Sequence, residues 1–525
     1  MVAAFEGPRP RGARQGKAGA GSEVPRCPRI GTAPLRKPDG SMAGAPAKRA
    51  RLSAAANLGR ALETLNTRRS GDAEDGRAGT RRTDGVAEGW TGVGLTADEV
   101  ARFSRPCLVT SFGPRRQLSL CRASALVVGV GGLGTPAATY LAASGVGMLG
   151  LCDHDVVDAS NLHRQPLFDV ASVGKPKVEC AVERLRQAVE PRAVRVHDDN
   201  ACELSDGAPC QCATTPGVFA LRTHRAGLTR ENARATVRAY DVVLDCTDNP
   251  RTRYLLNDAC VLEGKPLIYG ASVGTEGQLT VYNHCGGPCL RCVFPEPANP
   301  NACDVCSDTG VLGFVPGIIG VMQAQEAIKV VTGFGRTLSG RMLYYDAEDC
   351  RQFMAKLRGR RPECAACGLE ATVSSQFSMP HDDAAVTCAK PPPSYPNRWT
   401  PARLAKALGE GSGERVVLLD VRSDNQHAMC ALHGSVSVPY ETSLADAEAL
   451  AARAPDLEAA AAAAAAEARE DGQALHIVCY CRRGNDSQLA AARLEPLLHA
   501  HASVVDLEGG LNAWRRDVDE AFPVY

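Results

Sequence analysis

Short apolar runs alternate with longer amphipathic stretches between residues 95 and 370. The short runs include ALVVGV, GMLGLCD, DVVLDCT, PLIYGAS and GQLTVYN, and each has the pattern of a strand. Helix-like stretches such as TPAATYLAASGV lie between them. Because strands that alternate with helices form a mainly parallel sheet with helices on its faces, this part of the chain is predicted to be an α/β domain.

A second, smaller α/β unit is predicted over residues 398–525. Its strand-like runs are RVVLLDV, LHIVCY and SVVDLEGG, and its helix-like runs are DSQLAAARLEPLL and LNAWRRDVDEAF. Residues 371–397 are predicted to be a linker, because the prolines of AKPPPSYPNR oppose a helix and favour an extended chain. In the first unit, the irregular stretch at residues 198–228 is predicted to be an inserted surface loop.

Residues 1–94 show little hydrophobic periodicity and are rich in Ala, Gly, Arg and Pro. A segment of this composition cannot bury enough apolar surface to offset the entropy of ordering, so we predict that it is disordered. Within it, PAKRARL resembles a nuclear localisation signal, a pattern that short basic clusters also produce by chance. The abundance of Arg and Ala also fits a transit peptide, which Glu6 and the early prolines disfavour.

Length and composition narrow the class of protein. A chain of 525 residues, 44% of them hydrophobic, is expected to form two folded domains. Its net charge of zero argues against direct nucleic-acid binding, and no apolar run reaches the roughly 18 residues of a membrane-spanning helix. The 22 cysteines are dispersed and follow no signal-peptide core, so metal binding or thiol chemistry in the cytosol is expected rather than a disulfide framework.

A glycine-rich turn follows the first strand-like run. Gly129, Gly131 and Gly134 have the G-x-G-x-x-G spacing between a strand and a helix, where backbone amides and the positive end of the helix dipole bind phosphate. Asp153 ends the next strand, from which a carboxylate reaches ribose hydroxyls. These features alone favour an NAD-dependent oxidoreductase.

Two cations and a carboxamide downstream favour ATP instead. Asn161, Arg164 and Lys177 follow the acidic residue closely. A dinucleotide carries about two phosphate charges, whereas a triphosphate carries about four and needs cations for its pyrophosphate to leave. Asp248 ends the strand DVVLDCTD, at the carboxyl edge where sheets of this type bind ligands.

The motifs GVGGLG, CDHDVVDASNLHRQ, GKPK and DCTDNPRTRYLLNDAC resemble the ubiquitin-activating-enzyme superfamily, in the adenylyltransferase branch that includes the molybdopterin synthase sulfurylases. The resemblance covers residues 95–370 and implies a Rossmann-like domain that adenylates with ATP and Mg²⁺. It places Asp248 and Asn249 beside the phosphates and Mg²⁺. The other ATP contacts that it implies are Gly132, Asp153, Ser160, Asn161, Leu162, His163, Arg164 and Lys177.

The segment RFSRPCL is similar to the family's RYSRQ segment, in which an arginine reaches the phosphates of the partner subunit. Arg102 and Arg105 match this pattern, whereas Pro106 stands where the family has glutamine. The resemblance therefore implies a homodimer, and the proline leaves the local helix in question.

Two widely separated C-x-x-C pairs predict a structural zinc site. Cys289 with Cys292 and Cys364 with Cys367 supply four thiolates, which close a tetrahedron around Zn²⁺ with no open position. The resemblance supports this reading, and a redox pair is the alternative for either motif taken alone.

A third C-x-x-C pair, Cys303 with Cys306, precedes the apolar run GIIGVMQAQEAIKVVTG. The family's reactive cysteine is followed by a small residue, Asp and a Gly-rich step into a helix, and CSDTGVLG fits this from Cys306. The resemblance thus implies a catalytic Cys306, as a thioester or disulfide partner. A helix start would favour its thiolate. An inert Cys306 and competition of Cys303 for zinc are the alternatives.

In the second unit, VVLLDVR, the cysteine loop CYCRRGNDSQ and EGGLNAWRRDVDEAFPVY resemble a rhodanese domain over residues 398–525. In that fold the loop amides and the next helix face the sulfur of Cys481, and we expect them to stabilise a thiolate and then a persulfide. A phosphatase loop needs arginine six residues after its cysteine, where this chain has Ser487. Asp486 opposes a small sulfur anion such as thiosulfate.

The two-domain order resembles eukaryotic enzymes that adenylate the C-terminal Gly-Gly of small ubiquitin-like sulfur carriers and convert it to a thiocarboxylate. These carriers serve tRNA wobble uridine 2-thiolation and molybdopterin synthesis, and a cysteine desulfurase type of protein persulfide would donate sulfur to Cys481. The chain is therefore predicted to be an adenylyltransferase and sulfurtransferase. A non-catalytic sulfur-relay or scaffold protein is one alternative, and an NAD-dependent oxidoreductase is the other.

Overall fold

The computed structural model describes residues 93–189, 193–197, 217–296, 310–373, 394–409 and 412–523. Several predictions concern residues outside these ranges. They include the N-terminal segment up to residue 92, most of the predicted insertion and linker, and the pair Cys303 and Cys306.

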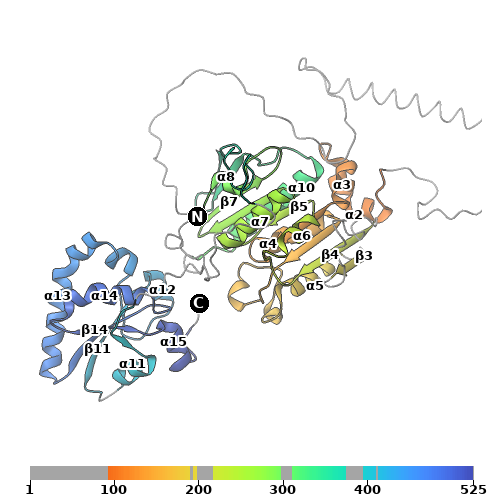
Figure 1. The fold of residues 1–525 in the computed structure, drawn as a ribbon. Coiled ribbons are helices and arrows are strands. Elements are labelled where there is room, and N and C mark those ends of the chain that lie inside the picture. The colour runs from red at the N-terminus through yellow and green to blue at the C-terminus, as the bar shows by residue number, and fades with distance from the viewer. Residues whose placement is uncertain are drawn as a thin grey trace, which may run out of the picture.

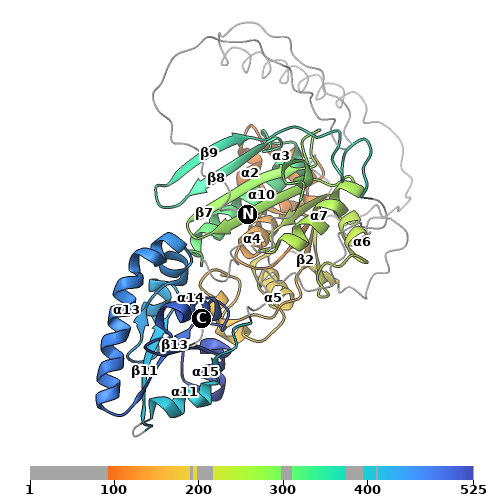
Figure 2. The ribbon, with the colours of Figure 1, turned by 60° about the vertical axis from the view of Figure 1, so that its left-hand side comes forward.

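A nine-stranded sheet forms the first domain (Figure 1). Its first six strands are parallel and its last three are antiparallel, and Figure 2 shows these last three side by side. The α/β prediction with a mainly parallel sheet is confirmed. In spatial order the strands are β3 (Ala193–His197), β4 (Val218–His224), β2 (Met148–Cys152), β1 (Ser124–Val128), β5 (Val242–Asp245), β6 (Leu267–Val273), β7 (Glu276–Tyr282), β8 (Arg341–Asp346) and β9 (Arg351–Lys356).

Helices cover both faces of this sheet, so its central strands are buried on both sides. Successive side chains of a strand point to opposite faces. Val127 accordingly packs into one core and Leu126 into the other. The helices are α2 (Ala97–Leu108), α3 (Gly113–Cys121), α4 (Gly134–Ser144), α5 (Lys177–Val189), α6 (Ala233–Arg238), α7 (Pro250–Leu262), α8 (Leu290–Val293) and α10 (Phe314–Thr332).

By length and composition alone, helix α10 is long and apolar enough to cross a membrane, although Gln323, Glu326 and Lys329 interrupt its apolar residues. Half of its apolar window is buried inside the protein, and Ile319 belongs to the core between helices and sheet. It also carries two buried polar residues with partners. Gln323 Nε2 donates to the carbonyl oxygen of Asp245 at 2.7 Å, and Glu326 accepts from the amide of Leu338 at 2.8 Å. These contacts make α10 a core helix of this domain.

A five-stranded parallel sheet forms the second unit. One hydrophobic core lies under α13 and α14, and another lies under α11 and α15. The long helix α13 contains a run of alanines. In spatial order the strands are β10 (Arg398–Trp399), β14 (Ser503–Leu507), β13 (Ala474–Tyr480), β11 (Glu414–Asp420) and β12 (Val436–Ser437); the helices are α11 (Pro401–Leu408), α12 (Asp424–Met429), α13 (Ala447–Glu470), α14 (Asp486–Leu498) and α15 (Gly510–Asp517).

Candidate functional site

A tight glycine turn joins β1 to α4. Gly129 has a φ of 87°, and a Cβ at this position would lie 2.6 Å from the carbonyl oxygen of Cys246. A Cβ at Gly134 would lie 1.9 Å from the carbonyl oxygen of Gly129. Only glycine fits both positions, because a side chain at either would strike backbone atoms. The turn thus brings the start of α4 close to whatever ligand occupies the adjoining pocket.

This pocket has a volume of about 300 Å³ and lies at the carboxyl ends of β1, β2 and β5. Open α/β sheets bind ligands at this edge. Ser160, Leu162 and His163 lie in the segment between β2 and α5 but do not line the pocket. The predicted nucleotide contacts that do line it are Gly132, Asp153, Asn161, Arg164, Lys177, Asp248 and Asn249. Their binding of a nucleotide stays a prediction.

Asp153 is buried, and its carboxylate binds two backbone amides. Oδ2 accepts from the amide of Val130 at 2.7 Å, and Oδ1 accepts from the amide of Asp155 at 2.8 Å. These bonds tie the glycine turn to the end of β2. A carboxylate has about four acceptor positions, so Asp153 keeps the capacity to bind ribose hydroxyls as well.

Two cations face the pocket from different segments. Lys177 is buried at the start of α5, and its Nζ lies 2.8 Å from Oδ2 of Asp155. Arg164 donates to the carbonyl oxygen of Ser160 at 3.0 Å and to Nε2 of His163 at 2.8 Å. Burial, and then the charge of Arg164, lower the pKa of His163, so its neutral ring accepts this bond. The positive charges therefore suit a polyanionic ligand.

Asp248 and Asn249 line the same pocket at the point where β5 leads into α7. Asp248 is exposed at the pocket. Asn249 is the N-cap of α7, and its Oδ1 accepts from the amide of Thr252 at 2.8 Å. An asparagine at this position satisfies one of the free amides of the first helical turn. Asn249 therefore fixes the start of α7 at the pocket wall.

Sequence reasoning missed Arg253, which is buried and lines the same pocket. It donates to the carbonyl oxygen of Thr247 at 2.7 Å and to the hydroxyl of Tyr269 at 3.1 Å. Its Nε lies 4.0 Å from Oδ2 of Asp245, whose pKa is raised because burial outweighs the attraction of Arg253. The spacing of one helical turn from Asn249 is the signal that places Arg253 on the same side of α7.

Arg102 and Arg105, the two arginines predicted to act across a dimer, differ from each other in their surroundings. Arg102 donates to the carbonyl oxygens of Val189 at 3.2 Å and of Ala188 at 3.3 Å. These are the last carbonyls of α5 in the same chain, and arginine commonly stabilises a helix end in this way. The Arg105 side chain is exposed on α2.

The four predicted zinc-ligating cysteines come together in one cluster. Their sulfur atoms all lie within 4.8 Å of one another, with Cys289 and Cys292 beginning α8 and Cys364 and Cys367 in a later loop. Burial raises the pKa of Cys292 to about 11. Burial also opposes ionisation of Cys367, but hydrogen bonds from Arg360 and the other cysteines hold its pKa below the ordinary value. Four converging thiols of this geometry fit a closed tetrahedral metal site.

Cys481 lies just beyond β13, with its sulfur buried under the following loop. The amide of Gly484 donates to Sγ at 3.1 Å, and the hydroxyl of Ser487 donates to it at 3.4 Å. The predicted loop geometry is therefore present. The hydrogen bonds of the loop lower the pKa of Cys481, in the expected direction, but burial and then the charge of Asp486 outweigh them, so the pKa of the free thiol is raised.

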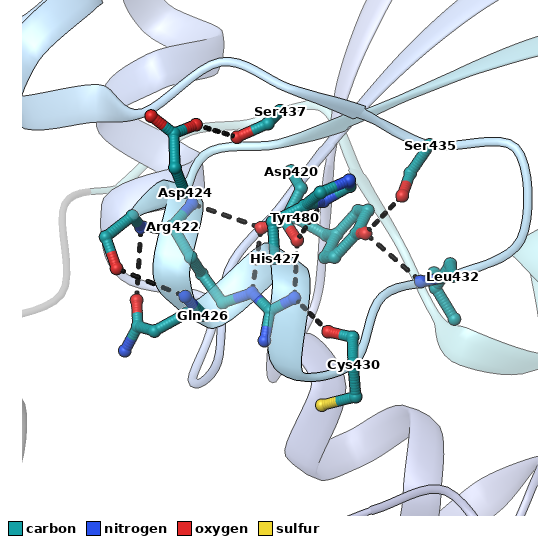
Figure 3. Close-up of polar contacts among 11 residues, drawn as sticks. Asp420, Arg422, Asp424, Gln426, His427, Cys430, Leu432, Ser435, Ser437 and Tyr480 are labelled. Atoms are coloured by element: carbon teal, nitrogen blue, oxygen red, sulfur yellow. Dashed lines mark hydrogen bonds and ion pairs between the residues drawn. The ribbon is translucent and has the colours of Figure 1, made fainter.

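A buried ion pair braces the neighbouring strand end (Figure 3). Arg422 donates from Nε to Oδ1 of Asp420 at 2.8 Å and from Nη2 to the carbonyl oxygen of Cys430 at 2.6 Å. The ring of His427 binds the same carboxylate through Nδ1 at 3.0 Å. Tyr480, which pairs with Asp420 across the sheet, donates its hydroxyl to Ser435 at 2.8 Å. This network holds the end of β13, the strand that directly precedes Cys481.

Comparisons with known proteins agree with this division of the chain. The profile of the ThiF family matches residues 103–366, and that of the rhodanese-like domain matches residues 400–517. Among curated relatives, the adenylyltransferase and sulfurtransferase MOCS3 of Anopheles gambiae is 39% identical, over 82% of this chain and 90% of the relative. MOCS3-1 of Zea mays is 41% identical over 82% and 84%, and MOCS3 of Arabidopsis thaliana is 39% identical over 82% and 87%.

Proposed function

The chain belongs to the adenylyltransferase and sulfurtransferase family, in which a ThiF domain precedes a rhodanese-like domain. On the basis of this membership, we propose the substrate of the protein and the roles of its residues. It adenylates the C-terminal glycine of a small ubiquitin-like sulfur carrier and then converts that carboxylate to a thiocarboxylate. The observation that carries the proposal is the presence in one chain of a cation-lined pocket and of a buried, amide-bonded Cys481.

The first step takes place in the pocket beside the glycine turn. A carboxylate oxygen of the carrier attacks the α-phosphorus of ATP, pyrophosphate leaves, and an acyl adenylate forms. Lys177 and Arg164 offset the negative charge that develops on the leaving pyrophosphate. Asp248 lies where a carboxylate would hold Mg²⁺, which supplies positive charge to the phosphates when it is bound.

The second step joins the activated carrier to sulfur on Cys481. A protein persulfide of the cysteine desulfurase type transfers its outer sulfur to Cys481. The Cys481 persulfide then attacks the acyl carbon, AMP leaves, and an acyl disulfide forms. A thiolate attacks Sγ of Cys481, and the carrier leaves as a thiocarboxylate while a disulfide remains on the enzyme. We assign this last thiolate to Cys306, which lies outside the described residues.

The cysteine cluster would hold one structural Zn²⁺. Four sulfur atoms within 4.8 Å of one another match the donor set and closed geometry of such sites. When bound, the ion supplies a cross-link between α8 and the loop that carries Cys364. No step of the reaction passes through it.

Membership of this family also suggests the carrier proteins, the cellular compartment and the oligomeric state of the enzyme. We propose carriers that serve tRNA wobble uridine 2-thiolation and molybdopterin synthesis, and action in the cytosol. The exposed Arg105 on α2 is available to the nucleotide of a second subunit in a homodimer. The proposed domains are residues 95–370 and 398–525, with residues 1–94 as an N-terminal segment outside both and residues 371–397 as the linker.

Separate substitutions in the two domains should separate the two steps. Cys481→Ala should retain carrier-dependent exchange of pyrophosphate into ATP but make no thiocarboxylate, because only the sulfur nucleophile is lost. Arg164→Ala should reduce the exchange by roughly a hundredfold or more, since a charged contact to the leaving phosphates is removed. Exchange is measured with labelled pyrophosphate, and thiocarboxylate by intact mass of the carrier.

Cys430→Ala is the matched control, because Cys430 is a partly buried cysteine of the same domain and accepts the hydrogen bond of Arg422 with its backbone oxygen, which the substitution retains. It should retain both steps. Thiocarboxylate formation by the Cys481→Ala variant would refute the role of Cys481. A wild-type protein without carrier-dependent exchange would instead favour the relay or scaffold alternative, and tighter binding of NAD than of ATP would favour the oxidoreductase.

A further inference from the structure

The loop that follows Cys481 packs against the turn that begins α15. The amide of Leu511 donates to the carbonyl oxygen of Cys481 at 2.9 Å, and the amide of Asn512 donates to that of Arg482 at 3.0 Å. The first amides of a helix have no partner within the helix, so these two bind the loop instead. Helix α15 is itself anchored, because Leu511 and Trp514 lie in a hydrophobic core of the domain. The loop is therefore held from the side of α15.

Gly510, the first residue of α15, makes this close approach possible. It is buried and has a φ of 59°, in the left-handed region that favours glycine. A Cβ at this position would lie 2.3 Å from the carbonyl oxygen of Cys481 and 2.7 Å from the amide nitrogen of Gly484. Both atoms belong to the backbone, which cannot rotate away as a flexible side chain can. A side chain at Gly510 would therefore force α15 and the loop apart.

The amide of Gly484 is the same group that binds the sulfur. It donates to Sγ of Cys481 at 3.1 Å. Gly484 is itself closely packed, because a Cβ there would lie 2.7 Å from the amide nitrogen of Gly509. We propose that Gly510 is a positioning residue, which allows α15 to hold the amide of Gly484 against the sulfur of Cys481. The proposal rests on the role of Cys481 in the proposed function, and it adds the residue that sets a hydrogen bond of its sulfur.

This hydrogen bond favours the reactive form of Cys481. An amide binds a thiolate more strongly than a neutral thiol, so a fixed donor lowers the pKa of the thiol. The bond opposes burial and the charge of Asp486, which raise this pKa. Displacing the amide of Gly484 should therefore raise the pKa of Cys481 further and leave less thiolate to accept sulfur from a persulfide donor.

Gly510→Ala tests the proposal in the full-length protein. Alkylation of Cys481 by iodoacetamide is followed by peptide mass spectrometry between about pH 7 and 11. The midpoint of the rate profile reports the pKa of Cys481, whereas the rate at the alkaline end reports access of the reagent. We expect the midpoint to rise by about one pH unit, with alkylation roughly tenfold slower below it, because a hydrogen bond to a charged acceptor is lost.

Gly472→Ala is the matched control. Gly472 lies in the same domain and has a φ of 67°, but a Cβ there would have no atom within 4 Å. The substitution therefore reproduces the backbone strain of Gly510→Ala without the contact to the loop. It should keep the wild-type midpoint.

Asn512→Pro provides a second variant in case Gly510→Ala does not fold. Proline is tolerated in the first turn of a helix, and the side chain of Asn512 is exposed, so the core is retained. The substitution removes the amide that binds the carbonyl oxygen of Arg482. Its midpoint should also rise, whereas Asn512→Ala retains the amide and should keep the wild-type profile.

A folded Gly510→Ala or Asn512→Pro variant with the wild-type midpoint would overturn the proposal. So would an equal shift in Gly472→Ala, since backbone strain alone would then explain it, or a rate changed by the same factor at every pH, which reports access only. Alkylation needs neither carrier nor sulfur donor, so it reports on the loop even if the proposed function fails. Thiocarboxylate formation by the wild-type protein is measured in parallel and detects that failure separately.

Discussion

Asp486 is the residue whose charge bears most directly on the sulfur site. It begins α14 with an exposed side chain, and after burial its negative charge is the largest cause of the raised pKa of Cys481. An acid in the first turn of a helix is also favoured by the helix dipole, so the fold tolerates it well. We therefore expect Asp486 to oppose small anionic sulfur donors, as the sequence pattern predicts, and to leave a protein persulfide acceptable as the donor.

Asp486→Asn should lower the pKa of Cys481 and make thiosulfate a better donor. Removing one exposed negative charge near the sulfur should lower the free-energy barrier for reaction with an anion by a fraction of a kcal/mol to about 1 kcal/mol. The rate of sulfur transfer from thiosulfate to cyanide should therefore rise roughly twofold to fivefold. Asp424→Asn is the matched control, since Asp424 is an exposed acid in the first turn of α12 of the same domain. An equal rise in both variants would show that Asp486 has no special role.

At the scale of elements, the contact between α10 and α4 sets the shape of the pocket beside the glycine turn. A Cβ at Gly320 of α10 would lie 2.2 Å from the carbonyl oxygen of Leu133, which is backbone at the start of α4. A Cβ at Gly132 would lie 3.1 Å from the side chain of Pro316 of α10. Both Leu133 and Pro316 line the pocket. The close approach of the two helices therefore depends on the absence of a side chain at Gly320.

Gly320→Ala should destabilise the protein by about 1–3 kcal/mol, because the added carbon forces backbone apart in a packed core. It should also weaken ATP binding, since Leu133 must move. Gly317→Ala in the same helix has no atom within 4 Å of its added carbon, and it should be neutral or stabilise by up to about 1 kcal/mol. Chemical unfolding and calorimetric titration with ATP distinguish the variants, and equal losses in both would contradict the packing argument.

The cysteine cluster links parts of the chain that are far apart in sequence. Cys289 Sγ lies 3.6 Å from Cys364 Sγ, and Cys292 Sγ lies 3.3 Å from Cys367 Sγ. A metal at this point closes a long loop that contains α10, β8 and β9. Its binding energy is then part of the folding energy of the whole first domain.

Purified protein should contain one zinc per chain by elemental analysis, and removal of the metal with a strong chelator should lower the melting temperature of the first domain. Added Zn²⁺ should reverse the change. Cys364→Ser should have the same effect without a chelator, because a ligand is lost, whereas Cys350→Ser, which alters an exposed cysteine outside the cluster, should retain the metal. Metal-free protein with wild-type melting behaviour would contradict a structural zinc site.

Local pattern in the sequence determined the alternation of strands and helices, the glycine turn at Gly129 and Gly134, and the two cysteine knuckles. Each depends on residues close together in the chain, where sterics and hydrophobic period act directly. Only the tertiary structure decided that Arg253 lines the pocket beside the glycine turn and that the pKa of Cys481 is raised. These outcomes depend on burial and on charges from strands and helices distant in sequence, which the order of residues does not reveal.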